Sequence, residues 1–338
     1  MLPSLTPLRL ADRFDRFFDA QVRSRYFRNL DFAGPQGDPG WFGPDSATWY
    51  VHSHLPTLTF GLLCAAYIEG LDPSIQAMTA DHSRLAIKTE GGYSIDPDGA
   101  AVRFGRSLSF FTGTAYGSTE TAERLTRTVR AMHHTVKGTR PDGLAYDAGN
   151  PEWLRWNYAT VVWGLATAHE KYHARPLRGA ELDRYYGEFV RVGHALGGTE
   201  LPTTKTETLD CLKSYLPKLA VTPNKAASTG PNLSRKLSDR LHNYPFTDPF
   251  TDWAIRDTLP RWAASMVMHQ RLTPLATRAR RRLIRLTLNG LHTATGPLEE
   301  FRQAQARVAA GTTSAHTLPG HEPGSDPGRS REDIELDA

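Results

Sequence analysis

Residues 152–172, EWLRWNYATVVWGLATAHEKY, decide the fold class of this chain. The stretch is expected to form one long helix that ends before Pro176, because proline cannot continue a helix. Apolar side chains fall on most sides of that helix: Trp153, Leu154, Trp156, Val161, Val162, Trp163 and Leu165. A helix that is apolar nearly all round is buried. The stretch therefore predicts a helix in the middle of a bundle.

The segments on either side also read as helices. No alternating strand pattern, internal repeat or glycine-rich phosphate loop is evident, so the predicted class is all-α. One helix is expected to begin at an N-terminal cap, either Ser118 or Thr119. The same helix is expected to end with Lys137 in a basic last turn and Gly138 as the C-terminal cap. The other expected helices are Leu8–Phe27, 47–68 with a break near Pro56, Val102–Ala115, Glu181–Leu196, Leu209–Leu216, Trp253–Met268, Leu275–Leu291 and Leu298–Val308.

The domain organisation follows from length and composition. The chain has 338 residues, of which 39% are hydrophobic and 22% charged, so a sizeable core is possible and wholesale disorder is excluded. Residues 311–338 have almost no apolar side chains and are expected to be a disordered tail. We therefore predict one helical domain over residues 1–310, followed by the tail.

Composition also excludes several function classes. The net charge of +4 is small, and a mild basic bias alone does not indicate nucleic-acid binding. Two cysteines, Cys64 and Cys211, exclude a disulfide scaffold and a four-cysteine metal site. The first residues lack a signal-peptide pattern, and the longest apolar run, 58–68, is too short to cross a membrane. We expect a cytoplasmic protein with no membrane span. The 13 histidines favour a metal site.

One candidate site is the sequence HEKYH at His169–His173. It matches H-E-x-x-H, in which two histidines on one helix face bind zinc and the glutamate, here Glu170, acts as base. The pair falls on the last turn of its helix, because Pro176 follows at once. Glu181 and Glu188 are possible third ligands, but neither comes with a recognisable motif. Two unrelated histidines at a helix end remain the ordinary interpretation.

A second candidate is His133. The apolar side chains of its helix are spaced 4, 3 and 4 residues apart and form one stripe: Leu125, Val129, Met132 and Val136. At about 100° per residue, His133 lies roughly 60° from the centre of that stripe and His134 about 160° away. Only His133 can therefore point into the interior, where a lone histidine is most often a satisfied core residue.

Two groups of arginines are also candidates. Arg103, Arg106 and Ser107 stand at i, i+3 and i+4, so they share one helix face. The ordinary interpretation is that the two arginines are a surface pair. Beside a cofactor, however, the arginines could bind its carboxylates and the serine hydroxyl could donate a hydrogen bond to bound oxygen. The second group lies in the helix expected over 275–291 and consists of Arg278, Arg280, Arg281, Arg282 and Arg285. No aromatic residues are interleaved with these arginines, as they would be in a nucleic-acid-binding surface. A solvated helix face is therefore favoured, and a surface for an acidic redox partner is the second interpretation.

An ordered set of short motifs resembles the catalytic domain of the MpaB/rubber-oxygenase family, which includes the latex-clearing proteins. The resemblance covers about residues 37–202 and rests on these segments: 37–46 (GDPGWFGPDS) with Trp49, Val51 and His52; 81–83 (DHS); Arg103, Arg106 and Ser107 with Tyr116-Gly117; His133 with 137–143 (KGTRPDG); Trp156, Ala159 and Thr160; and Pro176-Leu177 with Glu181 and 184–186 (RYY).

The resemblance implies an all-α, globin-like fold that encloses haem b, with His133 as the proximal ligand to the iron. Such a ligand leaves the opposite face of the iron free for dioxygen. Arg103 would bind a haem propionate or stabilise negative charge on bound oxygen. Ser107 would donate a hydrogen bond to that oxygen or orient a water, and Arg106 would form a polar wall or gate. These three are the expected catalytic residues.

This sequence departs from the family pattern at three positions. Arg106 and Ser107 replace the Lys and Thr that are more frequent in the rubber-cleaving branch, and Tyr158 replaces a frequent His. The rubber-cleaving members are also exported. We therefore expect a haem-dependent oxygenase that uses dioxygen on a small, largely apolar intracellular metabolite. The reaction would be oxidative cleavage of a C=C bond or hydroxylation, with an electron donor as partner where the reaction consumes electrons.

Two other functions stay open at this stage. A zinc-dependent hydrolase would be built on His169, Glu170 and His173. The second alternative is a non-catalytic protein that binds haem or a lipophile. If His133 is not the iron ligand, His82 and His134 are the next candidates.

Overall fold

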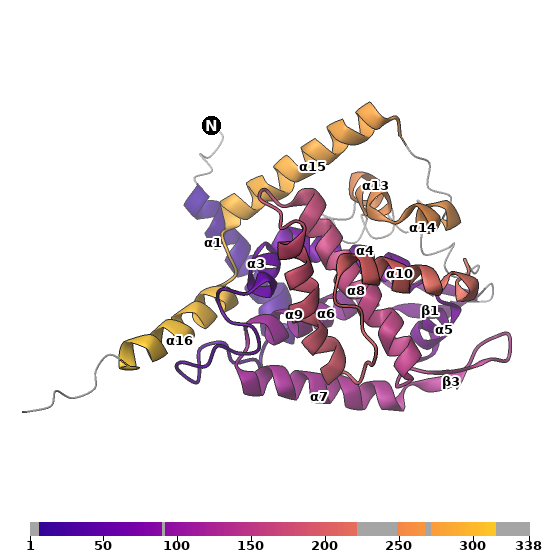
Figure 1. Ribbon diagram of the computed structural model, residues 1–338, viewed down its shortest axis with the longest axis horizontal. Helices are drawn as coiled ribbons and strands as arrows, with labels where there is room; N and C mark the ends of the chain where they lie inside the picture. The colour runs from indigo at the N-terminus through magenta and orange to yellow at the C-terminus, as the bar shows by residue number, and fades with distance from the viewer. Residues whose placement is uncertain (1–6, 90–91, 222–248, 268–271, 316–338) are drawn as a thin grey trace, which may run out of the picture.

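The computed structural model describes residues 7–89, 92–221, 249–267 and 272–315, and its regular structure is almost entirely helical (Figure 1). The prediction of an all-α fold is confirmed. The α-helices are α1 (Pro7–Phe18), α2 (Ser24–Tyr26), α3 (Ala47–Ser53), α4 (Leu55–Glu69), α5 (Pro73–His82), α6 (Pro97–Tyr116), α7 (Thr119–Thr135), α8 (Pro151–Tyr172), α9 (Ala180–Ala195), α10 (Lys205–Ser214), α13 (Pro249–Thr258), α14 (Arg261–Met266), α15 (Pro274–Thr295) and α16 (Glu299–Ala315).

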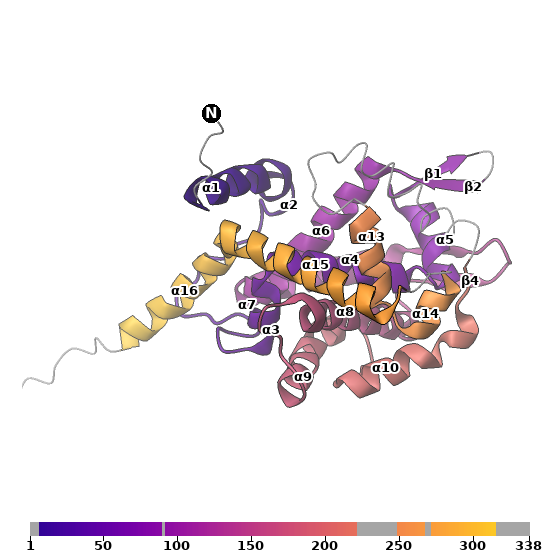
Figure 2. The same cartoon turned by 90° about the horizontal axis from the view of Figure 1, so that it is seen from above.

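Helices α4 and α8 form the centre of the molecule, as the apolar stretch 152–172 predicts. Two glycines let their backbones approach closely. A Cβ atom on Gly61 would lie 2.7 Å from the Cα of Leu165, and one on Gly164 would lie 2.6 Å from the carbonyl oxygen of Gly61. Helix α15 crosses over α4 and α8 on the outer face of the bundle (Figure 2). Within the described residues, no helix is both long and apolar enough to cross a membrane.

Prolines and polar caps set the helix boundaries. Ser46 caps α3, its hydroxyl accepting from the backbone N–H of Trp49 at 3.0 Å. Pro56 stands in the first turn of α4, where its missing N–H costs nothing, so the expected break near Pro56 is found. The stretch expected as one helix over Trp253–Met268 is instead α13 and α14, because Pro260 interrupts it; Met268 lies outside the described residues.

The end of α7 differs from the prediction. The helix ends at Thr135, and Lys137 with Gly138 begins a strand rather than closing the helix. Strands β3 (Lys137–Thr139) and β4 (Ala145–Asp147) form an antiparallel hairpin in which Lys137 lies opposite Asp147, at 3.0 Å between Nζ and Oδ2. A second hairpin pairs β1 (Ala86–Thr89) with β2 (Gly92–Ile95). These strands are too short to give an alternating pattern in sequence.

A buried arginine ties three distant segments together. Arg307 of α16 is 1% exposed, and its guanidinium donates to three backbone carbonyls. These are the carbonyls of Asp38 at 2.8 Å, Phe32 at 2.9 Å and Gly117 at 3.3 Å. The Asp38 carboxylate in turn accepts from the backbone N–H of Thr119 at 2.7 Å. The glycine- and proline-rich stretch around residues 34–45 is therefore clamped against the junction of α6 and α7.

We expect Arg307→Met to lower the free energy of unfolding by about 3 kcal/mol, because two buried carbonyls and one partly buried carbonyl lose their donor at about 1 kcal/mol each. Urea unfolding followed by circular dichroism measures the change. Arg302→Met on the same helix is the matched control, because its side chain is 44% exposed and pairs with Glu299. An equal loss in both variants would contradict the clamp.

The helical domain continues past the predicted start of the tail. Helix α16 extends to Ala315, and the backbone N–H of Gly37 donates to the carbonyl of Arg307 at 2.8 Å. A Cβ on Gly311 would lie 2.3 Å from the Cα of Gly37, so this helix packs directly on the early chain. The rest of the expected tail, residues 316–338, lies outside the described residues.

Candidate functional site

His133 lies in the last turn of α7, and its orientation matches the helical-wheel prediction. The side chain is half-buried, whereas that of His134 is exposed. Ser118 begins the helix by accepting a hydrogen bond from the backbone N–H of Thr121 at 3.2 Å. Met132, which the wheel placed on the inner stripe, is 50% exposed. It lies one turn beyond Val129, the last stripe residue of α7 that packs against the main core.

The surroundings of His133 keep its imidazole neutral. Its pKa is lowered to about 4, chiefly by burial and to a smaller extent by electrostatic interaction with Arg103 and His134. A neutral ring has a lone pair to offer, which a metal ligand requires. Its Nδ1 atom is buried and has no hydrogen-bond partner in the described part of the chain. The ring is thus a desolvated, uncharged nitrogen donor.

Trp153, in the first turn of α8, contacts His133 edge-to-face. The two ring centroids are 5.2 Å apart and the ring planes are 89° apart. Asn150 fixes the start of α8, its side-chain oxygen accepting from the backbone N–H of Glu152 at 2.8 Å. This places the indole against the imidazole as an edge-to-face aromatic pair.

Of the three expected catalytic residues on α6, the structure brings one within charge range of His133. Arg103 is exposed, and its guanidinium is close enough to help lower the pKa of His133. Arg106 is exposed and Ser107 is half-buried; among the described residues, no charge effect or ring contact joins either one to His133. Phe104 and Phe111 on the same helix pack against the main core.

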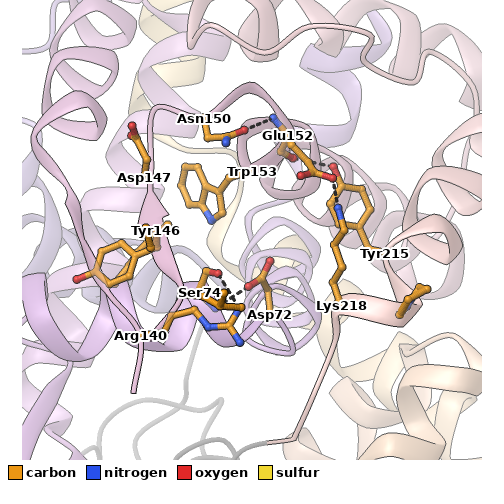
Figure 3. A pocket seen from close by; sticks show the side chains of 14 residues that line it. Asp72, Ser74, Arg140, Tyr146, Asp147, Asn150, Glu152, Trp153, Tyr215 and Lys218 are labelled. Carbon is orange, nitrogen blue, oxygen red and sulfur yellow. Dashed lines mark hydrogen bonds and ion pairs between the residues drawn. The ribbon is translucent and has the colours of Figure 1, made fainter. Parts of the chain in front are cut away.

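Trp153 also lines a cavity of about 500 Å³ (Figure 3). Its walls come from the start of α5, the β3–β4 hairpin, the start of α8 and the 3₁₀ turn Leu216–Lys218. Figure 3 shows the Trp153 ring lying between Asn150 and Ser74, with Tyr215 and Lys218 to one side. Lys218 pairs with Glu152 at the rim. An aromatic and polar chamber therefore shares a side chain with the His133 site.

His82, an alternative iron ligand in the sequence analysis, is already hydrogen-bonded. It is exposed at the end of α5, and its Nε2 lies 3.1 Å from the hydroxyl of Tyr146 and 3.2 Å from the carbonyl of Lys137. The Tyr146 hydroxyl donates to Asp81 at 2.8 Å. These bonds join α5 to the β3–β4 hairpin, which gives His82 a structural role.

The H-E-x-x-H pair does not have the geometry of a zinc site. The rings of His169 and His173 are stacked, with centroids 4.5 Å apart and planes 24° apart. The Nε2 of His169 accepts from the backbone N–H of Leu177 at 3.0 Å. Glu170 is bound to Lys205 at 2.6 Å instead of facing the histidines. In the described ranges, no group of three His, Cys, Asp or Glu side chains is placed to hold a metal ion.

These two histidines instead belong to a larger group. His54 precedes α4 and His292 lies on α15; together with His169 and His173 they form what we call the histidine cluster. The ring centroid of His54 lies 4.2 Å from that of His292 and 4.9 Å from that of His173. Burial and the neighbouring rings lower the pKa of His54 and of His169 to about 3. The cluster is a group of neutral rings in mutual contact, contributed by the start of α4, the end of α8 and α15.

Sequence reasoning missed two features of these sites. Trp153 was counted only as one of many apolar side chains of the central helix, since nothing in the sequence places it against His133. His54 and His292 were not connected to the H-E-x-x-H pair, because they are far from it along the chain. A surplus of histidines was the only available signal.

Comparisons with known proteins place the chain in a family. Residues 49–290 match the family model described as ER-bound oxygenase mpaB/B'/Rubber oxygenase, catalytic domain. Searches of curated proteins and of solved structures each found no match. The matched range runs from within α3 to within α15, includes the His133 site and covers well over half of the chain. The chain therefore belongs to the MpaB/rubber-oxygenase catalytic-domain family.

Proposed function

We propose that this protein is a haem b-dependent oxygenase that uses dioxygen on a small, largely apolar metabolite. The observation that carries the proposal is the neutral, half-buried imidazole of His133, which lies within range of the Arg103 charge in a domain of an oxygenase family. Oxidative cleavage of a C=C bond and hydroxylation both fit this site. Membership of the family supports the reaction class.

The residues present suit a haem. His133 offers an uncharged nitrogen, and its buried, unpartnered Nδ1 marks a donor that no described side chain or backbone group uses. The guanidinium of Arg103 lies on the facing helix, where it can bind a propionate. When bound, haem b supplies the iron that activates dioxygen. Trp153 holds the imidazole plane by its edge-to-face contact.

The α6 side chains have distinct proposed roles. Arg103 binds a propionate and favours negative charge that develops on oxygen atoms nearby. The Ser107 hydroxyl donates a hydrogen bond to a reacting oxygen atom or holds a water. Arg106, one turn from Arg103 and exposed, forms a polar wall at the entrance. Phe104 and Phe111 supply apolar surface for the substrate.

The absorption spectrum tests this proposal. Protein produced with a haem precursor is expected to show a Soret band and stoichiometric iron, and to consume dioxygen when apolar unsaturated substrates are added. Uptake of dioxygen without an added reductant would indicate cleavage that incorporates both oxygen atoms, whereas a requirement for reductant would indicate hydroxylation. Absence of a Soret band overturns the proposal, and stoichiometric zinc would assign the protein to the hydrolase alternative.

A further inference from the structure

Helix α15 exposes an apolar stripe that the bundle does not cover. Leu275, Leu283 and Leu286 are 77%, 54% and 63% exposed. At about 100° per residue, they fall with Ala279 within one arc of about 80°. The opposite side of the helix carries the buried residues Ile284 and Leu288. This 22-residue helix therefore has two apolar sides, of which only one packs on the described part of the protein. Figure 2 shows the helix lying on the outside of the bundle.

The arginines of α15 divide between these two sides. Arg281 pairs with Asp257 at 2.6 Å and Arg285 donates to the carbonyl of Ala174, so both hold the helix to the bundle. Arg280 lies over the ring of Trp253 at 5.1 Å. Sequence reasoning assigned the whole run to a solvated face, but the structure uses these three as contacts to the protein itself.

The two remaining arginines lie along one edge of the exposed leucines. Arg278 and Arg282 are exposed and lie about 100° and 60°, respectively, from the centre of the stripe. In the described part of the chain, no acidic side chain lies within ion-pair distance of either one. The surface thus combines aliphatic side chains with positive charge that no acidic side chain of the described residues neutralises, along a helix about 33 Å long.

This combination fits a lipid surface better than a protein partner. Helices that lie in the bilayer interface bury aliphatic side chains among the acyl chains while flanking arginines reach the headgroups. Protein interfaces are instead enriched in aromatic residues, and α15 has none on its exposed side. Positive charge selects membranes with anionic headgroups.

We infer that the exposed face of α15, formed by Leu275, Leu283, Leu286, Arg278 and Arg282, docks the protein on anionic membrane surfaces. The inference stands on the exposure and charge of this helix and does not depend on haem binding. It describes attachment parallel to the membrane plane, not a membrane-spanning segment.

Vesicle flotation with the full chain tests this inference. The protein is expected to float with vesicles of equal parts phosphatidylcholine and phosphatidylglycerol, and hardly with phosphatidylcholine alone. Leu283→Gln with Leu286→Gln should lower the partition coefficient about tenfold or more, because two aliphatic side chains no longer enter the bilayer. Glutamine has a helix propensity close to that of leucine, so the helix is retained. Arg278→Gln with Arg282→Gln should lower binding to anionic vesicles roughly tenfold.

Two controls make the result specific. Leu144→Gln changes an equally exposed leucine, 58% exposed, on the β3–β4 hairpin, and should float like the unchanged protein. Thermal unfolding should be unaffected in every variant. Failure of the unchanged protein to float overturns the inference, as does flotation that the leucine variant retains in full. A dimer that this variant dissociates would assign the face to a second copy of the chain, which also overturns it.

Discussion

Replacing His133 with alanine is expected to abolish stable haem binding. The variant loses the neutral imidazole that the proposal makes the only protein ligand to the iron. Haem transferred to it should show a spectrum like that of free haem, and iron content should fall from stoichiometric to a small fraction. Added imidazole should partly restore the Soret band, because a small ligand can occupy the space that the side chain leaves.

His134→Ala is the matched control for this experiment. His134 is the next residue on the same helical turn, but its side chain is exposed, so its removal should leave the spectrum unchanged. His82→Ala should also retain the band, because its Nε2 is already bonded to Tyr146 and Lys137. A His133→Ala protein with an unchanged spectrum would place the iron ligand elsewhere in the chain.

Acidification is expected to destabilise the fold strongly because of its buried histidines. The pKa values of His52, His54 and His169 are lowered from 6.5 to about 3, chiefly by burial, and those of His173 and His292 are also lowered. Below about pH 6.5, these histidines therefore bind protons in the unfolded chain but remain unprotonated in the folded chain. Stability is at its full value above pH 6.5 and falls as the pH decreases toward 3.

The size of this effect follows from proton linkage. Each histidine that is protonated only in the unfolded state lowers the free energy of unfolding by about 1.4 kcal/mol per pH unit. Three such rings give a slope of about 4 kcal/mol per pH unit, enough to unfold a typical domain near pH 5. Urea unfolding midpoints measured between about pH 7 and about pH 5 give this slope directly.

A single substitution tests whether the histidine cluster contributes to the slope. His292→Leu removes one ring, whose Nδ1 is buried without a partner in the described structure, and keeps apolar contact with His54. The slope of unfolding free energy against pH should decrease by up to about 1.4 kcal/mol per pH unit, the contribution of one histidine. His134→Leu, at an exposed position, should leave it unchanged. A midpoint that is independent of pH in the unchanged protein would contradict the assignment of neutral buried rings.

Much of the fold could be predicted because its signals are local. The stretch 152–172 is apolar on most sides, and it forms the central helix α8. Ser118 carries the capping side chain that begins α7, and Pro56 stands in the first turn of α4. The orientation of His133 relative to His134 depends only on the 100° rotation per residue, so a helical wheel was sufficient to choose between them.

What the sequence could not determine is which face of a helix its neighbours cover. A helical wheel orders side chains around an axis but does not contain the other helices, so it could not show that Met132 and the leucines of α15 are exposed. The histidine cluster and the Trp153 contact depend on residues that are distant along the chain and meet only when α4, α7, α8 and α15 pack. The sequence by itself determined the all-α class, the central helix and the inward histidine of α7. Only the tertiary structure decided which charges and rings surround that histidine, because burial and electrostatic shifts arise from neighbours that are brought together by folding.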